Sequence, residues 1–159
     1  MGAGKTATGK ALADLVRMGF LDLDEEIESE THLSINEIFQ KRGEPFFRAE
    51  EKRILCRVTR QTNTIVATGG GIVLDPENVK RMKETGRVIY LAASFESLWN
   101  RVRDKKDRPL LRVTDPQGMF YQLFQVRRPL YESSASGKID TEGLSPEEVA
   151  QKIVEFYLK

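Results

Sequence analysis

A glycine-rich turn followed by lysine and threonine opens the chain, as Gly2-Ala3-Gly4-Lys5-Thr6. Such a turn offers backbone N–H groups to phosphate oxygens, an ammonium group for the β- and γ-phosphates and a hydroxyl for Mg²⁺. The full pattern, G-x-x-x-x-G-K-[ST], needs an earlier glycine before Met1 and a hydrophobic strand before that. We therefore expect a loop and helix that bind a nucleoside triphosphate, with the preceding strand outside the sequence. A Gly/Ala-rich start with a chance Lys-Thr pair is the alternative.

Composition favours one domain and a small-molecule partner. The 159 residues, 40% of them apolar, suffice for one core. Twenty-five basic and 24 acidic side chains leave a net charge of +1, which gives no general attraction to nucleic acid or membranes. No signal peptide, spanning segment or lipidation motif is found, and the lone Cys56 is expected to be a buried, inert thiol. We predict a cytoplasmic protein and place His32 on the surface without a metal role.

Predicted strands and helices alternate along the chain. Apolar residues at helical spacing follow Lys5, whose helix would point its positive N-terminal end at a phosphate. The expected strands are 19–24, 64–68, 87–91 and, more weakly, 138–141. The expected helices are 25–31, 34–42, 50–61, 95–103 and three that begin at 76, 119 and 145. This alternation predicts a parallel α/β sheet covered on both faces, with ligands at the carboxyl ends of its strands.

Two carboxylates end the first predicted strand. Asp22 and Asp24 would lie at the edge of the sheet where ligands bind. One could help to hold Mg²⁺, and the other could accept a proton or hydrogen bond from a hydroxyl. The alternative is that Asp24 is a solvated helix N-cap within an acidic first turn.

A glycine turn and several arginines complete the candidate site. Gly69-Gly70-Gly71 follows a buried strand, so its backbone N–H groups could approach a ligand closely, unless it is only a flexible turn. Arg48 follows two phenylalanines and suits bidentate capture of a carboxylate, but an ordinary helix-surface ion pair would also explain it. Arg108 and Arg127 lie in basic runs that suit phosphoryl transfer, with a solvated basic face as the alternative. Because these motifs occur together in one chain, we favour the functional interpretation over the separate alternatives.

With these motifs in order along its whole length, the chain resembles the shikimate kinases. The stretches that carry the resemblance are Gly2–Thr6, Phe20–Asp24 with Ile27-Glu28, Ser34–Phe39, Gly43–Arg48, Thr68–Gly71, Arg108–Leu111 and Arg127–Tyr131. The resemblance implies transfer of the ATP γ-phosphoryl group to the 3-hydroxyl of shikimate, in the pathway to chorismate and the aromatic amino acids. It also implies a three-layer α/β/α P-loop kinase fold whose five-stranded parallel sheet has the order 2-3-1-4-5, with the first strand missing here.

The resemblance also implies a domain plan. Residues 1–159 would form a single domain, with a substrate-binding helical region at 24–53 and a lid at 104–117. The implied partners are ATP, Mg²⁺ and shikimate, with no nucleic acid and no membrane, and the implied oligomeric state is a monomer.

Site roles are implied residue by residue. Lys5, Asp24 and Arg108 would be catalytic, and Thr6 with Asp22 would hold the metal. ATP would contact a set drawn from the loop and two arginines, namely Gly2, Ala3, Gly4, Lys5, Thr6, Arg101 and Arg108. Shikimate would contact the aspartate, the carboxylate-clamping arginines and the glycine backbone, namely Asp24, Arg48, Gly70, Gly71 and Arg127. Two alternatives stay open: another small-metabolite P-loop kinase, such as a gluconate kinase, and a non-catalytic nucleotide-sensing module.

Overall fold

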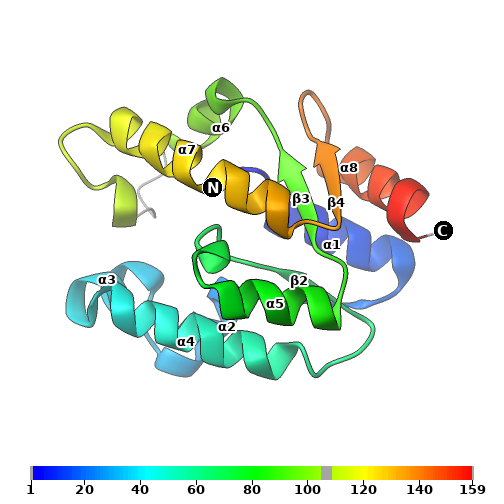
Figure 1. Ribbon diagram of the computed structural model, residues 1–159, viewed down its shortest axis with the longest axis horizontal. Coiled ribbons are helices and arrows are strands. Elements are labelled where there is room, and N and C mark those ends of the chain that lie inside the picture. The colour runs from blue at the N-terminus through cyan, green and yellow to red at the C-terminus, as the bar shows by residue number, and fades with distance from the viewer. Residues whose placement is uncertain (1, 105–108, 159) are drawn as a thin grey trace.

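The computed structural model describes residues 2–104 and 109–158 (Figure 1). Its strands are β1 (Gly19–Asp22), β2 (Thr64–Ala67), β3 (Ile89–Ala92) and β4 (Gly137–Asp140). Its α-helices are α1 (Lys5–Val16), α2 (Leu23–Thr31), α3 (Ile35–Lys41), α4 (Gly43–Val58), α5 (Pro76–Thr85), α6 (Phe95–Val102), α7 (Pro116–Ser134) and α8 (Pro146–Ile153). Short 3-10 turns η1 (Ile72–Leu74) and η2 (Pro109–Leu111) and a π-helical end, η3 (Val154–Leu158), complete it.

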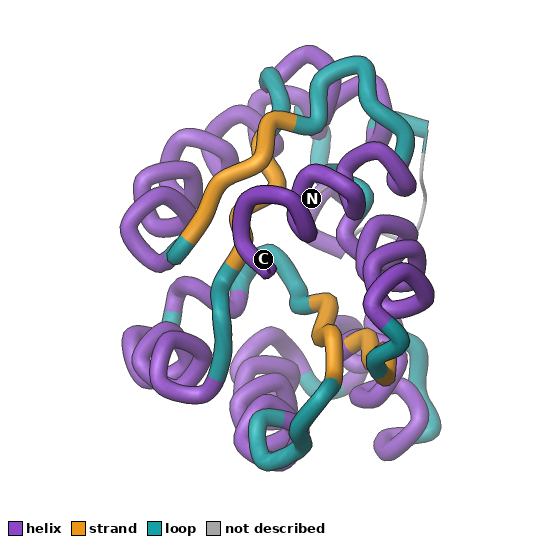
Figure 2. The backbone as a smooth tube through the Cα atoms, turned by 90° about the vertical axis from the view of Figure 1, so that its right-hand side faces the viewer, coloured by secondary structure: helices purple, strands orange, loops and turns teal. Residues whose placement is uncertain are grey.

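The strands form two parallel pairs. β1 pairs with β2 from Gly19 opposite Thr64, and β3 pairs with β4 from Ile89 opposite Gly137. Within the described residues no strand joins β2 to β3, and the pairs stand apart (Figure 2). Both pairs agree with the outer parts of the expected 2-3-1-4-5 order, which stays a prediction for the sheet as a whole.

Helices cover both faces of the strands, which confirms the α/β fold class. On one face, α1 and α8 pack together and share a core with side chains of β3 and β4; Ile65 of β2 packs against the same cluster. On the other face, α2, α3, α4 and η1 form a second core, against which Val66 of β2 and side chains of α5 and α7 pack. Ile65 and Val66 therefore point to opposite faces, as successive strand residues must.

The first strand is shorter than expected, because Leu23 and Asp24 begin helix α2 and do not extend β1. The Asp22 carboxylate accepts a hydrogen bond from the Asp24 N–H (3.0 Å), which makes Asp22 the N-cap. Three acidic residues in the first turn also favour a helix start. The N-cap of this helix is therefore Asp22, and the alternative that Asp24 is the N-cap is wrong.

Two further helices begin earlier than expected. Helix α4 starts at Gly43, well before Glu50, and α7 starts at Pro116, before Met119. Proline lies in the first turn of each, where its missing N–H costs nothing. For α7, Asp115 caps the start by accepting from the Gly118 N–H (2.9 Å).

His32 is exposed, as expected, and Cys56 in α4 is only partly buried, more open than expected. None of the helices among the described residues is long and apolar enough to cross a membrane.

Candidate active site

The glycine-rich loop lies at the N-terminus of α1. Gly2 and Gly4 both have left-handed backbones, with φ of 75° and 78°, which other residues rarely adopt. A side chain at Gly2 would also meet Val102 of α6 at 2.8 Å. Lys5 and Thr6 then open the helix, so that its positive end and the lysine share one position. This arrangement can bind phosphate.

Thr6 of α1 and Asp22 of β1 are sixteen residues apart in the sequence and are brought together at the site. The Thr6 hydroxyl donates to the Asp22 carboxylate at 2.6 Å. Hydroxyl and carboxylate oxygens are hard ligands, and Mg²⁺ in phosphate-binding sites takes only one or two protein ligands beside phosphates and water. The pair therefore fits the expected metal position.

Asp24, at the start of α2, faces a glycine across the site. A Cβ added to Gly69 would lie 3.3 Å from Asp24 Oδ1 and 2.8 Å from Glu51 Oε1. The absent side chain of Gly69 thus leaves room for two carboxylates beside the turn formed by Gly69–Gly71, hereafter the glycine turn.

Arg48 is held by two glutamates of its own helix, α4. Its Nε and Nη2 donate to Glu44 at 3.1 and 2.9 Å, and Nη1 donates to Glu51 at 2.8 Å. Burial lowers the pKa of Arg48, but Glu51 and Glu44 outweigh it and raise the pKa, so the guanidinium is charged. A Cβ on Gly71 would lie 2.4–2.6 Å from this guanidinium. Arg48 is therefore part of an ion-pair network and also lies against the glycine turn.

Glu51 pairs with Arg48 and lies near Arg127, and it was not identified from the sequence. Its side chain is 1% exposed, and burial raises its pKa against the opposing effect of Arg48. Arg127 and Asp24 are close enough to influence the same pKa. A signal existed, because Glu51 falls in the apolar stripe of α4, where an acid is rare unless paired.

Of the expected arginines that the structure describes, Arg127 is the most deeply buried, at 5% exposure. Among the described residues its Nε has no hydrogen-bond partner, although a buried donor without one is costly. Four residues further along α7, Tyr131 donates from its hydroxyl to the Gly70 carbonyl at 2.6 Å. Tyr131 of α7 thus contacts the glycine turn directly, on the same helix as Arg127.

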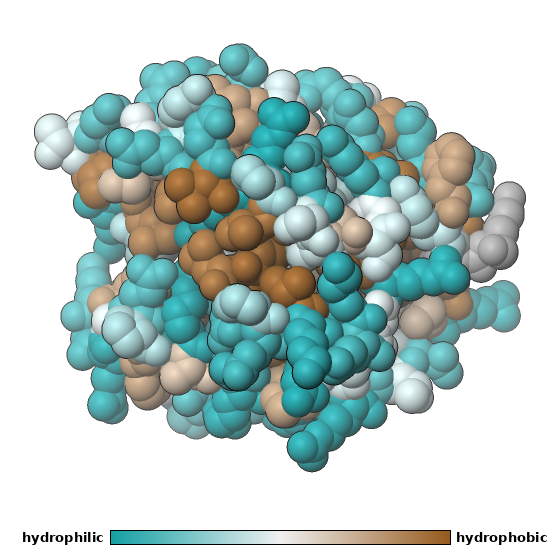
Figure 3. All heavy atoms as spheres, in the orientation of Figure 1, coloured by the Kyte–Doolittle hydropathy of each residue, from teal (hydrophilic) through white to brown (hydrophobic). Residues whose placement is uncertain are grey.

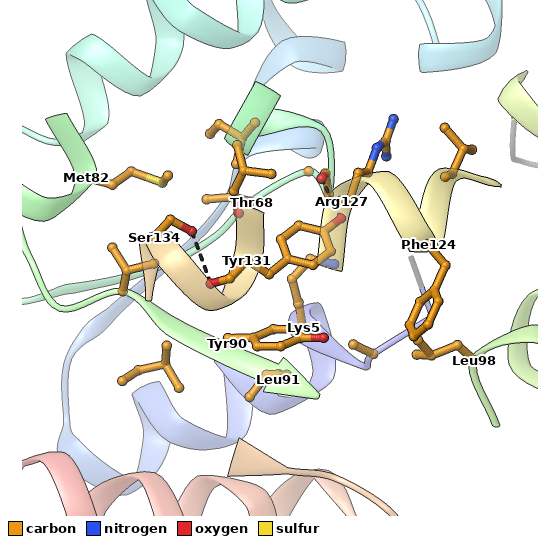
Figure 4. Close-up of a pocket in the computed structure, with 18 of the residues that line it drawn as sticks. Lys5, Thr68, Met82, Tyr90, Leu91, Leu98, Phe124, Arg127, Tyr131 and Ser134 are labelled. Atoms are coloured by element: carbon orange, nitrogen blue, oxygen red, sulfur yellow. Dashed lines mark hydrogen bonds between the residues drawn. The ribbon is translucent and has the colours of Figure 1, made fainter. Parts of the chain in front are cut away.

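A cavity of about 100 Å³ adjoins these groups. Its walls are largely apolar, from β3, α5, η1 and α7, and its polar lining includes Lys5, Thr68 and Arg127. Figure 3 shows hydrophobic side chains gathered between α7 and α5 on this side of the molecule. In Figure 4, Lys5 of α1, Tyr90 of β3 and Tyr131 of α7 converge on the cavity.

Two further arginines were expected at the nucleotide. Arg101 of α6 is exposed and donates to the Gly2 carbonyl at 3.4 Å, so it lies beside the phosphate loop. Arg108 lies outside the described residues, as does most of the charged part of the expected lid.

The fold and the site together define a P-loop kinase for a small metabolite. A family model described as shikimate kinase matches residues 1–158. The shikimate kinase of Thermodesulfovibrio yellowstonii is 45% identical, with 99% of this chain and 90% of the relative covered. That of Caldicellulosiruptor saccharolyticus is 39% identical, with 99% and 91% covered.

Solved structures agree with these relatives. The shikimate kinase from Acinetobacter baumannii in complex with shikimate has a TM-score of 0.96 at 39% identity, covering 99% of this chain and 88% of that one. The enzyme from Aquifex aeolicus has a TM-score of 0.86 at 35% identity, covering 98% and 90%. The chain therefore belongs to the shikimate kinase family. This family membership confirms the expected activity, phosphorylation of shikimate with ATP in the aromatic amino acid pathway.

Proposed function

We propose that this chain transfers the γ-phosphoryl group of Mg²⁺-bound ATP to the 3-hydroxyl of shikimate, and that the residues described above carry out the reaction. The observation that supports this assignment best is the meeting of Arg48, Arg127 and the glycine turn around buried Glu51. Two guanidinium groups beside backbone N–H groups suit a small carboxylate, which they can bind in one orientation.

In the proposed complex the carboxylate of shikimate lies between Arg48 and Arg127. Its ring hydroxyls then face Asp24, whose carboxylate can accept the hydrogen bond or proton of the reacting hydroxyl. Glu51 holds Arg48 by an ion pair and lies near Arg127, so Arg48 is positioned before substrate arrives.

At the other end of the site, the loop Gly2–Gly4 and Lys5 would bind the phosphates of ATP. Mg²⁺, held at Thr6 and through Asp22, would neutralise phosphate charge when bound. We assign Arg108 to the transferring phosphoryl group and Arg101 to the adenine side. The contact of Arg101 with the Gly2 carbonyl supports a position beside the nucleotide-binding loop.

The proposal keeps one domain over residues 1–159, with a substrate region at 24–53 and a lid at 104–117. The helical region α2–α4 supports the first of these assignments, since it carries Asp24, Arg48 and Glu51. We also propose that the protein is a monomer in the cytoplasm. Sedimentation of the purified chain would test the oligomeric state.

The test is ADP release with shikimate or neutral polyols as acceptor, with the product identified by ³¹P NMR. We expect turnover with shikimate and a single phosphate ester at its 3-hydroxyl. Arg48→Gln and Arg127→Gln should each raise the KM for shikimate by about 10² to 10³, because charge-assisted hydrogen bonds are lost. Arg60→Gln, a change at an exposed arginine after α4, is the matched control. Equal KM values in all three variants would contradict the clamp.

A further inference from the structure

Tyr131 lies where α7 meets the glycine turn. Its hydroxyl donates to the Gly70 carbonyl at 2.6 Å, and its ring packs against Tyr90 of β3 with centroids 5.3 Å apart. Figure 4 shows the ring between Thr68 and Tyr90, on the helix that also carries Arg127. This hydrogen bond therefore joins α7, which carries Arg127, to the glycine turn. Arg127 and the glycine turn are both expected to contact shikimate.

The hydrogen bond also fixes the orientation of a peptide group. The Gly70 carbonyl and the Gly71 N–H belong to one trans peptide, so they point in opposite directions. With the carbonyl held by Tyr131, the Gly71 N–H is turned away from that hydroxyl. Two adjacent glycines offer little steric preference of their own, and a tertiary contact must therefore select the orientation.

Arg127 and Tyr131 are four residues apart on α7 and so share one helix face. Burial raises the pKa of the Tyr131 hydroxyl, and the guanidinium of Arg127 opposes this effect only in part, so the hydroxyl keeps the proton that it donates. In the same turn, a Cβ on Gly71 would lie 2.4–2.6 Å from the Arg48 guanidinium. The Gly70–Gly71 peptide is thus held by Tyr131 at its carbonyl and lies close to Arg48 at Gly71.

We propose that Tyr131 is a positioning residue for substrate: by holding the Gly70 carbonyl, it presents the Gly71 N–H as a third donor to the carboxylate that Arg48 and Arg127 bind. The inference rests on the proposed function and adds a residue to which no role was assigned. Tyr131 touches neither the reacting hydroxyl nor ATP in this scheme, so its effect should be confined to binding of the carboxylate.

Tyr131→Phe keeps the ring and removes only the hydroxyl. We expect the Kd for shikimate, measured by titration calorimetry, to rise about 3- to 10-fold, which is the net value of one lost neutral hydrogen bond. The Kd for ATP should not change, and kcat should fall less than kcat/KM. Tyr121→Phe, at an exposed tyrosine of the same helix, should leave all these values unchanged.

The methyl ester of shikimate separates positioning from general support of the fold. The ester lacks the negative charge, so its binding should lose less than that of the acid when Tyr131 is changed. An equal loss for acid and ester, or no loss for the acid, would overturn the proposal. Failure of wild-type protein to bind shikimate would instead contradict the proposed function itself.

A measurement on wild-type protein removes any dependence on the folding of the variant. The amide proton of Gly71, followed by NMR, should shift downfield when shikimate is added and shift less with the methyl ester. An unchanged Gly71 amide in saturating shikimate would also overturn the proposal.

Discussion

At the scale of single residues, the site depends as much on absent side chains as on present ones. Gly69 leaves space for Asp24 and Glu51, and Gly71 leaves space for the guanidinium of Arg48. Both glycines belong to the glycine turn, which packs against the charged side chains just named. A substitution at either glycine would therefore displace functional groups as well as restrict the backbone.

Gly71→Ala should weaken shikimate binding. Its φ of −90° is accessible to alanine, but the new Cβ would lie 2.4–2.6 Å from the Arg48 guanidinium and would displace it. We expect a rise of about tenfold or more in the KM for shikimate, corresponding to about 1.4 kcal/mol. Gly86→Ala is the control, since its nearest atom is 3.9 Å away. Steady-state kinetics at saturating ATP measure the KM for shikimate. An unchanged KM in Gly71→Ala would contradict the close contact between Gly71 and Arg48.

Asp22→Asn should act on the metal without undoing the helix start. Asparagine caps helices about as well as aspartate, so thermal stability should change little. The lost charge should raise the Mg²⁺ concentration for half-maximal activity by about tenfold. A titration of rate against Mg²⁺ measures this, and an unshifted curve would remove Asp22 from the metal site.

At the scale of elements, helix α3 shows how one acid fixes a boundary. Ser34 and Glu37 form a capping box, in which the Glu37 carboxylate accepts from the Ser34 N–H at 3.0 Å. That hydrogen bond, helped by Lys41 and the Ser34 hydroxyl, lowers the pKa of Glu37 to about 2 from 4.5. The lowered pKa means that this carboxylate stabilises the fold only while it is ionised.

Glu37→Gln should therefore destabilise the protein in a pH-dependent way. The contribution of the charge is fully present above about pH 4.5 and is lost as the pH falls towards 2, because the folded state resists protonation. The free energies of unfolding of the wild type and the variant, measured with urea between pH 6 and 3, should converge as the pH falls. Glu96→Gln, an exposed acid in the first turn of α6, serves as the control. A difference that grows on acidification would contradict the assignment.

Element types were more predictable than element boundaries. The strand expected at 64–68 and the helices expected to begin at 76 and 145 agree with β2, α5 and α8 to within one residue at these bounds. The end of β1 was misjudged because Leu23 is apolar, as a strand residue would be, whereas the Asp22 cap turns it into the first residue of a helix. The hydrophobic pattern alone does not report which side-chain oxygen reaches a backbone N–H.

At the scale of the whole molecule, α1 contacts both strand pairs and carries the phosphate loop at its N-terminus. The loop, the two aspartates and the arginines could be proposed from local motifs, each by its chemistry. The grouping around Glu51 could not, since it brings α2, α4, α7 and the glycine turn together and depends on packing between distant segments.

Binding should stabilise the whole fold. Shikimate at about 100 times its Kd should raise the free energy of unfolding by about 2.7 kcal/mol, provided that it binds only the folded chain. Thermal unfolding with and without shikimate measures this, and Arg127→Gln should abolish most of the shift. A shift of equal size in that variant would show that shikimate binds elsewhere.

The central claim is that the site couples ATP to shikimate, and ADP formation tests it most directly. With purified protein, ATP and millimolar Mg²⁺, we expect rapid ADP release when shikimate is added, one ADP for each shikimate phosphorylated, and very little without it. ADP release at the same rate with and without shikimate would contradict the claim.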